Sequence, residues 1–140
     1  MTKRQLRYFN QAKEVAQQSD FPRVHIGAIV VYKHQVISKG CNTSSKTHRI
    51  QSQLNRKRFN ANSSGMLHAE VAALLPVINK FDLSQAVIYV YRENKLGELA
   101  MCRPCKGCMS FIKACGIRKI YYTTYDGYAE EYLAEEYLED

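Results

Sequence analysis

The sequence predicts an α/β protein in which helices cover one mixed sheet. Segments with an apolar residue every three or four positions alternate with short β-rich segments, in the order helix, hairpin, helix, strand, helix, strand, helix. The chain has 140 residues, of which 46% are hydrophobic and 24% charged, which is the range of globular proteins with one core. No linker or internal repeat interrupts it, so we expect a single domain over 1–140.

The first half of the chain predicts a helix and a hairpin. Segment 3–18 has apolar residues on one helical stripe: Leu6, Phe9, Ala12, Val15 and Ala16. A Ser-Asp-Phe-Pro break follows, and then two β-rich runs, 26–32 and 36–39, which predict a hairpin turned at 33–35. The stretch 43–67 is polar and basic and has no clear period, which indicates an insertion between regular elements.

The second half of the chain predicts two α/β units and a final helix. A helix is expected from 68 to about 81 with a kink at Pro76, then a strand over 86–91. Another helix over 105–115 stops at Gly116 and leads into a strand over 117–123. The tyrosine-rich acidic segment 128–139 predicts the last helix, which leaves little room for a further strand.

Charge is divided unevenly along the chain. The net charge is +7, but seven of the 13 acidic residues lie after residue 125, where the sequence has no Lys or Arg. Residues 1–125 therefore carry 20 basic and 6 acidic side chains, a balance of +14. An excess of this size favours anionic partners such as nucleotides or nucleic acid strands, although a solvated basic surface would have the same composition.

The distribution of apolar residues and cysteines indicates a cytoplasmic protein without a membrane span. The longest apolar run, 26–32, has seven residues, whereas a membrane helix needs about 20. The first 15 residues contain no secretory apolar region. Five unevenly spaced cysteines do not form a disulfide framework, so metal binding or chemistry is the better expectation for them.

Two short motifs combine into a candidate zinc site. His68-Ala69-Glu70 opens one predicted helix, and Pro104-Cys105-Lys106-Gly107-Cys108 opens another. The Cys-x-x-Cys spacing puts two sulfurs on one side of a first helical turn, where the helix dipole favours thiolates. One imidazole and two thiolates suit tetrahedral zinc with a fourth position for water, which is typical of catalytic zinc.

Glu70 has the right offset to act beside such a metal without binding it. A carboxylate there can take a proton from a zinc-activated water and deliver it to a ring nitrogen and then to a leaving amine. The pairing of H-x-E with P-C-x-x-C is a known signature of zinc nucleobase deaminases. Each half alone is weak, but together they predict one shared catalytic site.

The chain resembles the cytidine and deoxycytidylate deaminase superfamily over nearly its whole length. The matching segments are 26–31, 40–42, 68–74, 104–108 and 116–117. The resemblance implies a three-layer αβα fold with a mixed sheet of four to five strands. Within the superfamily the chain is most similar to small phage-type deoxycytidylate deaminases, which commonly carry a polar insertion before the HAE motif.

The resemblance also implies roles for particular residues. It makes His68, Cys105 and Cys108 the zinc ligands and Glu70 the proton shuttle. Asn42 matches an asparagine that contacts the substrate sugar, and the Ala69 amide and Arg103 carbonyl lie where members hold the base edge. Members often assemble as homo-oligomers, so self-assembly of this chain stays open.

Three hypotheses about function follow from these residues. The leading one is deamination of cytosine to uracil on a nucleotide, most simply dCMP to dUMP, with Arg23 as a candidate for the phosphate. The second places a cytosine or adenine in single-stranded DNA or tRNA, with Tyr121, Tyr122, Tyr125 or Tyr128 stacking on a neighbouring base. The third is a non-catalytic zinc module that binds nucleic acid, which Glu70 argues against. A second metal site at Cys41, His48 and Cys102 is a further alternative.

Overall fold

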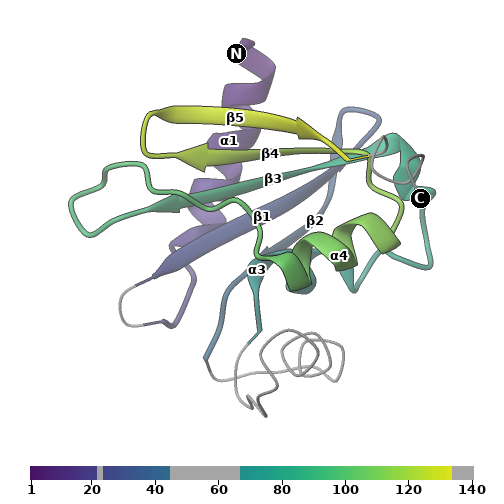
Figure 1. The fold of residues 1–140 in the computed structure, drawn as a ribbon, viewed down its shortest axis with the longest axis horizontal. Helices are drawn as coiled ribbons and strands as arrows, with labels where there is room; N and C mark the ends of the chain where they lie inside the picture. The colour runs from purple at the N-terminus through teal and green to yellow at the C-terminus, as the bar shows by residue number, and fades with distance from the viewer. Residues whose placement is uncertain (22–23, 45–66, 134–140) are drawn as a thin grey trace.

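The computed structural model describes residues 1–21, 24–44 and 67–133, which build a five-stranded sheet with helices on both faces (Figure 1). The strands are β1 (His25–Tyr32), β2 (Gln35–Cys41), β3 (Ala86–Glu93), β4 (Lys119–Thr124) and β5 (Gly127–Tyr132). Their order is β2-β1-β3-β4-β5, and only β3 and β4 run parallel. The mixed sheet and the three-layer αβα arrangement are as predicted.

One face of the sheet is covered by α1 (Lys3–Ala16). Thr2 and Gln5 form a capping box at its start, in which each side chain bonds the other residue's backbone N–H. The apolar stripe of the helix is buried against strand residues that point to this face of the sheet, such as Ile29, Tyr89 and Tyr121. The predicted N-terminal helix is therefore confirmed, and it ends two residues earlier than expected.

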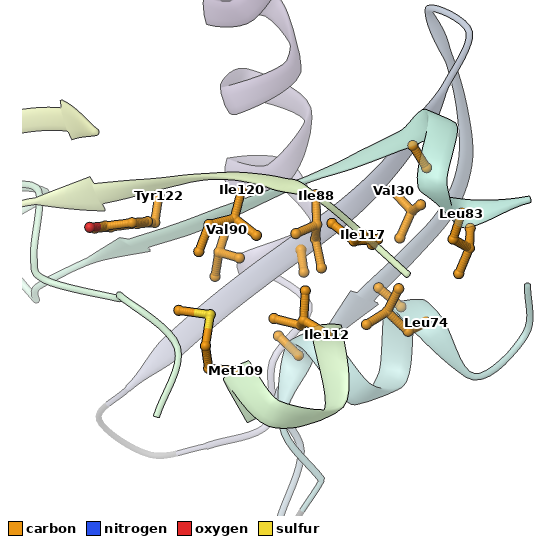
Figure 2. Close-up of a cluster of buried hydrophobic side chains, with 14 of the residues drawn as sticks. Val30, Leu74, Leu83, Ile88, Val90, Met109, Ile112, Ile117, Ile120 and Tyr122 are labelled. Carbon is orange, nitrogen blue, oxygen red and sulfur yellow. The ribbon is translucent and has the colours of Figure 1, made fainter. Parts of the chain in front are cut away.

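The other face is covered by α3 (Ala69–Leu74) and α4 (Lys106–Ala114). Figure 2 shows Leu74 of α3 and Ile112 of α4 directed toward the strand residues of the same core. Because alternate residues of a strand point to opposite faces, neighbouring Tyr121 and Tyr122 both pack in cores, one on each side of the sheet. The motif-bearing helices thus share one layer.

Two glycines allow helices to approach the sheet closely. A Cβ atom at Gly27 on β1 would collide with the backbone oxygen of Ala12 on α1. A Cβ atom at Gly40 on β2 would lie 2.5 Å from the backbone nitrogen of Ala73 on α3. Gly40 therefore allows the helix that begins with the H-x-E motif to pack directly against β2.

The helix predicted over 128–139 is wrong for its described part. Residues Gly127–Tyr132 form β5, which pairs antiparallel with β4 and alternates between half-buried and exposed positions. Gly127, with a φ of 142°, closes the tight turn from β4. The open edge of β4 offers backbone hydrogen bonds that outweigh the local helical pattern, and residues 134–140 lie outside the described part.

The helix predicted over 68–81 is also shorter than expected. It ends at Leu74, and hydrogen-bonded turns continue the chain to residue 81. Pro76 lacks an N–H and restricts the residue before it, so the helix stops instead of kinking. None of the helices in the described ranges has the length and apolar character that a membrane span requires.

Candidate active site

His68 is placed by the start of α3. It is the N-cap residue, with extended backbone (φ −77°, ψ 152°), and its side chain makes no capping hydrogen bond. The imidazole instead meets α4, where His68 Nδ1 lies 3.0 Å from Cys108 Sγ and 3.9 Å from Cys105 Sγ. The N-cap residue of α3 thus contacts the first turn of α4.

The two cysteines are placed by the start of α4. Cys105 is its N-cap, and its sulfur accepts a hydrogen bond from the backbone N–H of Cys108 at 3.5 Å. Cys108 is fully buried in the first turn, whereas Cys105 is partly exposed. The described residues contain one group of three potential metal ligands, His68, Cys105 and Cys108, whose donor atoms lie within 4.8 Å of one another.

Hydrogen bonds within this cluster shift the pKa values of all three groups. The Cys108 thiol, the backbone N–H of Cys108 and the His68 ring all bond Cys105 Sγ, and they lower the pKa of Cys105 to about 3. Bonding to Cys105, together with burial, raises the pKa of Cys108 well above its ordinary value. The bond to Cys105 also raises the pKa of His68. Binding of a divalent cation would displace these protons, as in other thiolate sites.

Glu70 is a buried carboxyl group next to the cluster. It lies in the first turn of α3, only 5% exposed, and desolvation raises its pKa above the ordinary value of 4.5. The positive charge of a protonated His68 opposes that shift. A carboxyl group with a raised pKa exchanges protons more readily near neutral pH, which suits general acid–base chemistry.

A cavity of about 350 Å³ opens onto these groups. Three of its lining residues, His68, Glu70 and Cys105, belong to the motifs. Ala69, Asn42 and Arg103, which the sequence also indicated, line the same cavity. Pockets of roughly 300–1,000 Å³ accommodate small organic ligands. The structure therefore brings six of the predicted site residues to one hollow.

The side chain of Asn42 ties the cavity wall together. Its Oδ1 accepts from the backbone N–H of Ile26 at 2.9 Å, and its Nδ2 donates to the carbonyl oxygen of Val24 at 2.8 Å. The residue is 6% exposed. These bonds fix the start of β1 beside the residue that follows β2, so Asn42 shapes the hollow whatever it contacts in a ligand.

The loop before α4 also lines the cavity, and it is held by residues that the sequence did not single out. Arg103 donates two hydrogen bonds to the carboxylate of Glu131 on β5, at 2.9 and 2.8 Å. Arg92 on β3 donates to the carbonyl oxygen of Met101 at 3.2 Å and also lines the cavity. Strand alternation puts Arg92 on the same face as Val90, a signal that could have identified it.

One further predicted residue, Tyr125, is not brought to this cavity. Tyr125 lies in the β4–β5 turn, 73% exposed, and is not among the lining residues. Arg23 and the segment 45–66, which includes His48, lie outside the described residues.

The proposed second metal site fits the structure poorly. Cys102 is buried in the core that contains α3 and α4, where its sulfur contacts Val90 O at 3.2 Å and Thr123 Oγ1 at 3.1 Å. Cys41 packs against the core on the α1 side, so the sheet lies between the two sulfurs. Burial raises the pKa of Cys102 to about 11, which disfavours the thiolate form that metals bind.

Comparison with known families decides the assignment of the chain. Residues 2–124 match the model of the cytidine and deoxycytidylate deaminase zinc-binding region. The chain belongs to this family. A search of curated proteins found no match.

Solved structures of deaminases share the fold. The dCMP deaminase of cyanophage S-TIM5 in its apo form is 24% identical, with a TM-score of 0.62 over 87% of this chain and 84% of that chain. The same phage enzyme in complex with dCMP and dUMP is 20% identical, with a TM-score of 0.61 over 87% and 82%. A cytidine deaminase from Burkholderia pseudomallei is 18% identical, with a TM-score of 0.63 over 94% and 93%.

The donor set of the cluster fits the zinc ion that the family name implies. One imidazole nitrogen and two cysteine sulfurs are ligands that zinc prefers, and three protein ligands leave one tetrahedral position for water or substrate. Glu70 lines the cavity but is not a member of the ligand group. The cluster is therefore compatible with a catalytic rather than a closed structural site.

Proposed function

We propose that the chain is a zinc-dependent hydrolytic deaminase that converts cytosine to uracil on a nucleotide, with dCMP to dUMP as its reaction. The observation that carries this proposal is a buried carboxyl group, Glu70, in a cavity that is also lined by His68 and Cys105 of the three-residue group of potential metal ligands. A structural zinc site needs no such group. Membership of the deaminase family supports the reaction class.

In the proposed reaction, water adds at C4 of cytosine and ammonia leaves. Zinc, held by His68, Cys105 and Cys108, would supply Lewis acidity and lower the pKa of the attacking water. Glu70 takes one proton from that water and delivers it to the ring nitrogen N3. It then takes the second proton from the new C4 hydroxyl and passes it to the departing amine. One water molecule is consumed and one ammonia is released, so the atoms balance.

The cavity walls favour a small anionic substrate. Arg92 and Arg103 both line the cavity, and residues 1–125 carry a positive balance of +14. Because Arg103 is paired with Glu131, Arg92 is the better candidate for a phosphate contact. Guanidinium groups bind phosphate oxygens well. The cyanophage deaminase of the same fold was crystallised with dCMP and dUMP, which supports the monophosphate as the substrate to test first.

The substrate assignment is tested with three cytosine compounds offered to the purified zinc-loaded protein: dCMP, deoxycytidine and a single-stranded oligonucleotide containing cytosine. We expect uracil formation and ammonia release from dCMP at a kcat/KM at least about tenfold above the other two. Preferred turnover of the oligonucleotide, with a steep salt dependence, would replace the nucleotide assignment by the polynucleotide one. Failure of all three would contradict cytosine deamination.

A further inference from the structure

A second and larger cavity lies on the α1 side of the sheet, between the first two turns of α1 and the turn that joins β1 to β2. Its volume is about 770 Å³. Five basic or imidazole side chains line it: Lys3, Arg4, Arg7, Lys33 and His34. Asp and Glu are absent from its lining. It lies across the sheet from the metal cluster, because α1 and α3 pack on opposite faces.

The cations of this cavity have no carboxylate counter-ions in the described part of the chain. The ion pairs found there join Lys13 to Glu93, Arg103 to Glu131 and Lys119 to Glu130. None of these six residues lines the second cavity. Its positive charge is therefore uncompensated by the residues that the structure describes.

The helix adds to this positive potential. Lys3 and Arg4 occupy the first turn of α1, which holds no acidic residue. The N-terminal end of a helix carries partial positive charge, so acidic residues stabilise it and basic residues do the opposite. Proteins place unfavourable charges of this kind at functional sites, where another gain offsets the cost.

Hydrogen bonds give the cavity a defined shape. Arg4 donates to Nδ1 of His34 at 3.2 Å, which uses one of the five N–H groups of the guanidinium. Tyr8 donates from its hydroxyl to the carbonyl oxygen of His34 at 2.8 Å, and Gln5 donates to the hydroxyl of Tyr121 at 3.0 Å. These bonds join α1 to the β1–β2 turn and to β4, so the elements that carry the exposed basic side chains are held together.

The tyrosines of the cavity do not offer a platform for a nucleobase. The rings of Tyr89 and Tyr121 stack on each other, with centroids 4.5 Å apart and planes 7° apart, and their exposed fractions are 3% and 5%. Tyr8, the third tyrosine of the lining, is 9% exposed and its ring centroid lies 5.2 Å from that of Tyr89, so the cavity presents little ring surface for a base. Recognition would therefore rest on the charge and hydrogen bonding of an anion.

We propose that this cavity binds a ligand through several phosphate groups. Four cationic side chains match more negative charge than one monoanion carries, and guanidinium groups bind phosphate oxygens in pairs. Two sources share this chemistry: a small molecule with several phosphates, and the phosphodiester backbone of single-stranded nucleic acid.

The test measures binding of two probes to the full zinc-loaded chain. Trimetaphosphate, titrated by calorimetry, represents the small ligand. A fluorescent oligothymidylate, followed by anisotropy at low salt, represents the strand and contains no cytosine for the candidate active site. The variant is Arg4→Gln/Arg7→Gln. Its control, Lys80→Gln/Lys95→Gln, removes the same charge at two exposed sites outside the cavity.

We expect at least one probe to bind about tenfold more weakly to the Arg4→Gln/Arg7→Gln variant than to wild type, with the control within about twofold. The probe that responds identifies the source of the phosphates. For the oligonucleotide, the salt dependence of affinity should also become shallower. Equal weakening in both double variants, or no binding of either probe to wild type, would overturn the proposal. Lys33→Gln, on the facing turn, provides an independent repeat.

Discussion

Glu131 shows how one residue of an unexpected strand positions the wall of the candidate active site. Its carboxylate accepts both hydrogen bonds from Arg103 and a third from the hydroxyl of Tyr122 at 3.2 Å. Bidentate pairs of this kind fix orientation as well as distance. Arg103 precedes Pro104 and Cys105, so the contact also steadies the entry to α4.

Replacement of Glu131 by Gln should weaken substrate binding more than chemistry. We expect the KM for dCMP to rise about two- to fivefold, with kcat less affected, because the pair supports the cavity wall and does not touch the reacting atoms. Steady-state kinetics of Glu131→Gln and Glu130→Gln give the comparison, since Glu130 pairs with Lys119 outside the cavity. Equal effects of the two variants would contradict the positioning role.

The same pair predicts a pH dependence of stability. Arg103 holds the pKa of Glu131 below its ordinary value of 4.5. A carboxylate whose pKa is lower in the folded state stabilises the fold fully above its unfolded-state pKa and loses that contribution as the pH falls through the folded value. The Arg103 side chain is 47% exposed, so the contribution is small, about 0.2–1 kcal/mol.

Urea unfolding of wild type and Glu131→Gln at neutral and acidic pH measures this effect. The difference in the free energy of unfolding should be present at neutral pH and shrink as the pH falls below 4.5. A difference that grows in acid would show that the ion pair is not its source.

At the scale of elements, the site depends on how tightly α3 sits on β2. The Gly40→Ala substitution places a methyl group against the backbone of Ala72 and Ala73, so we expect it to destabilise the fold by about 1–3 kcal/mol and to displace α3. Because α3 begins at His68, zinc content should fall as well.

Gly27→Ala is the matched control for this prediction, because it crowds α1 on the opposite face of the sheet. We expect a comparable loss of stability but normal zinc content in the folded fraction. Zinc analysis and thermal unfolding of both variants distinguish the two outcomes. Normal zinc content in Gly40→Ala would show that zinc binding does not depend on the close packing of α3 against β2.

Elements with a strong local signal could be predicted from the sequence. The stripe of α1, the hairpin of β1 and β2, and α4 between Cys105 and Gly116 all occur where the pattern indicated. The segment 127–132 could not be predicted, because its helical spacing of tyrosines is local whereas its strand partner, β4, is supplied by the tertiary fold.

Only the part of the candidate site that lies in the two sequence motifs could be predicted. His68, Glu70, Cys105 and Cys108 are found by spacing, because the chemistry demands those residue types at helix starts. Glu131 has no motif, and it was hidden by the wrong assignment of its segment. The large α1-side cavity is lined by residues far apart in the sequence. The charge balance of the sequence therefore predicts an anionic partner but not where on the protein it binds.

At the scale of the whole molecule, a metal ion bound by the cluster would link the two helices of one layer. His68 belongs to the start of α3, and both cysteines belong to the start of α4. A bound zinc ion would therefore stabilise the fold as well as supply chemistry. We expect chelation to lower the Tm by about 10 °C, and zinc, but not magnesium, to restore it.

Calorimetry of zinc-loaded and chelated protein checks this expectation. Cys108→Ser should lose zinc and no longer respond to the chelator. Cys115→Ser, at the other end of α4, should behave like wild type. An unchanged Tm after complete removal of zinc would contradict a metal bridge between the helices.

In the proposed mechanism Glu70 moves protons beside a metal that it does not bind. The most direct measurement is the kcat/KM of Glu70→Gln for dCMP, made on protein whose zinc content equals that of wild type. Gln keeps the size of the side chain and removes its acid–base function, so we predict a loss of at least about 100-fold. Activity within about twofold of wild type at full zinc occupancy would contradict the mechanism.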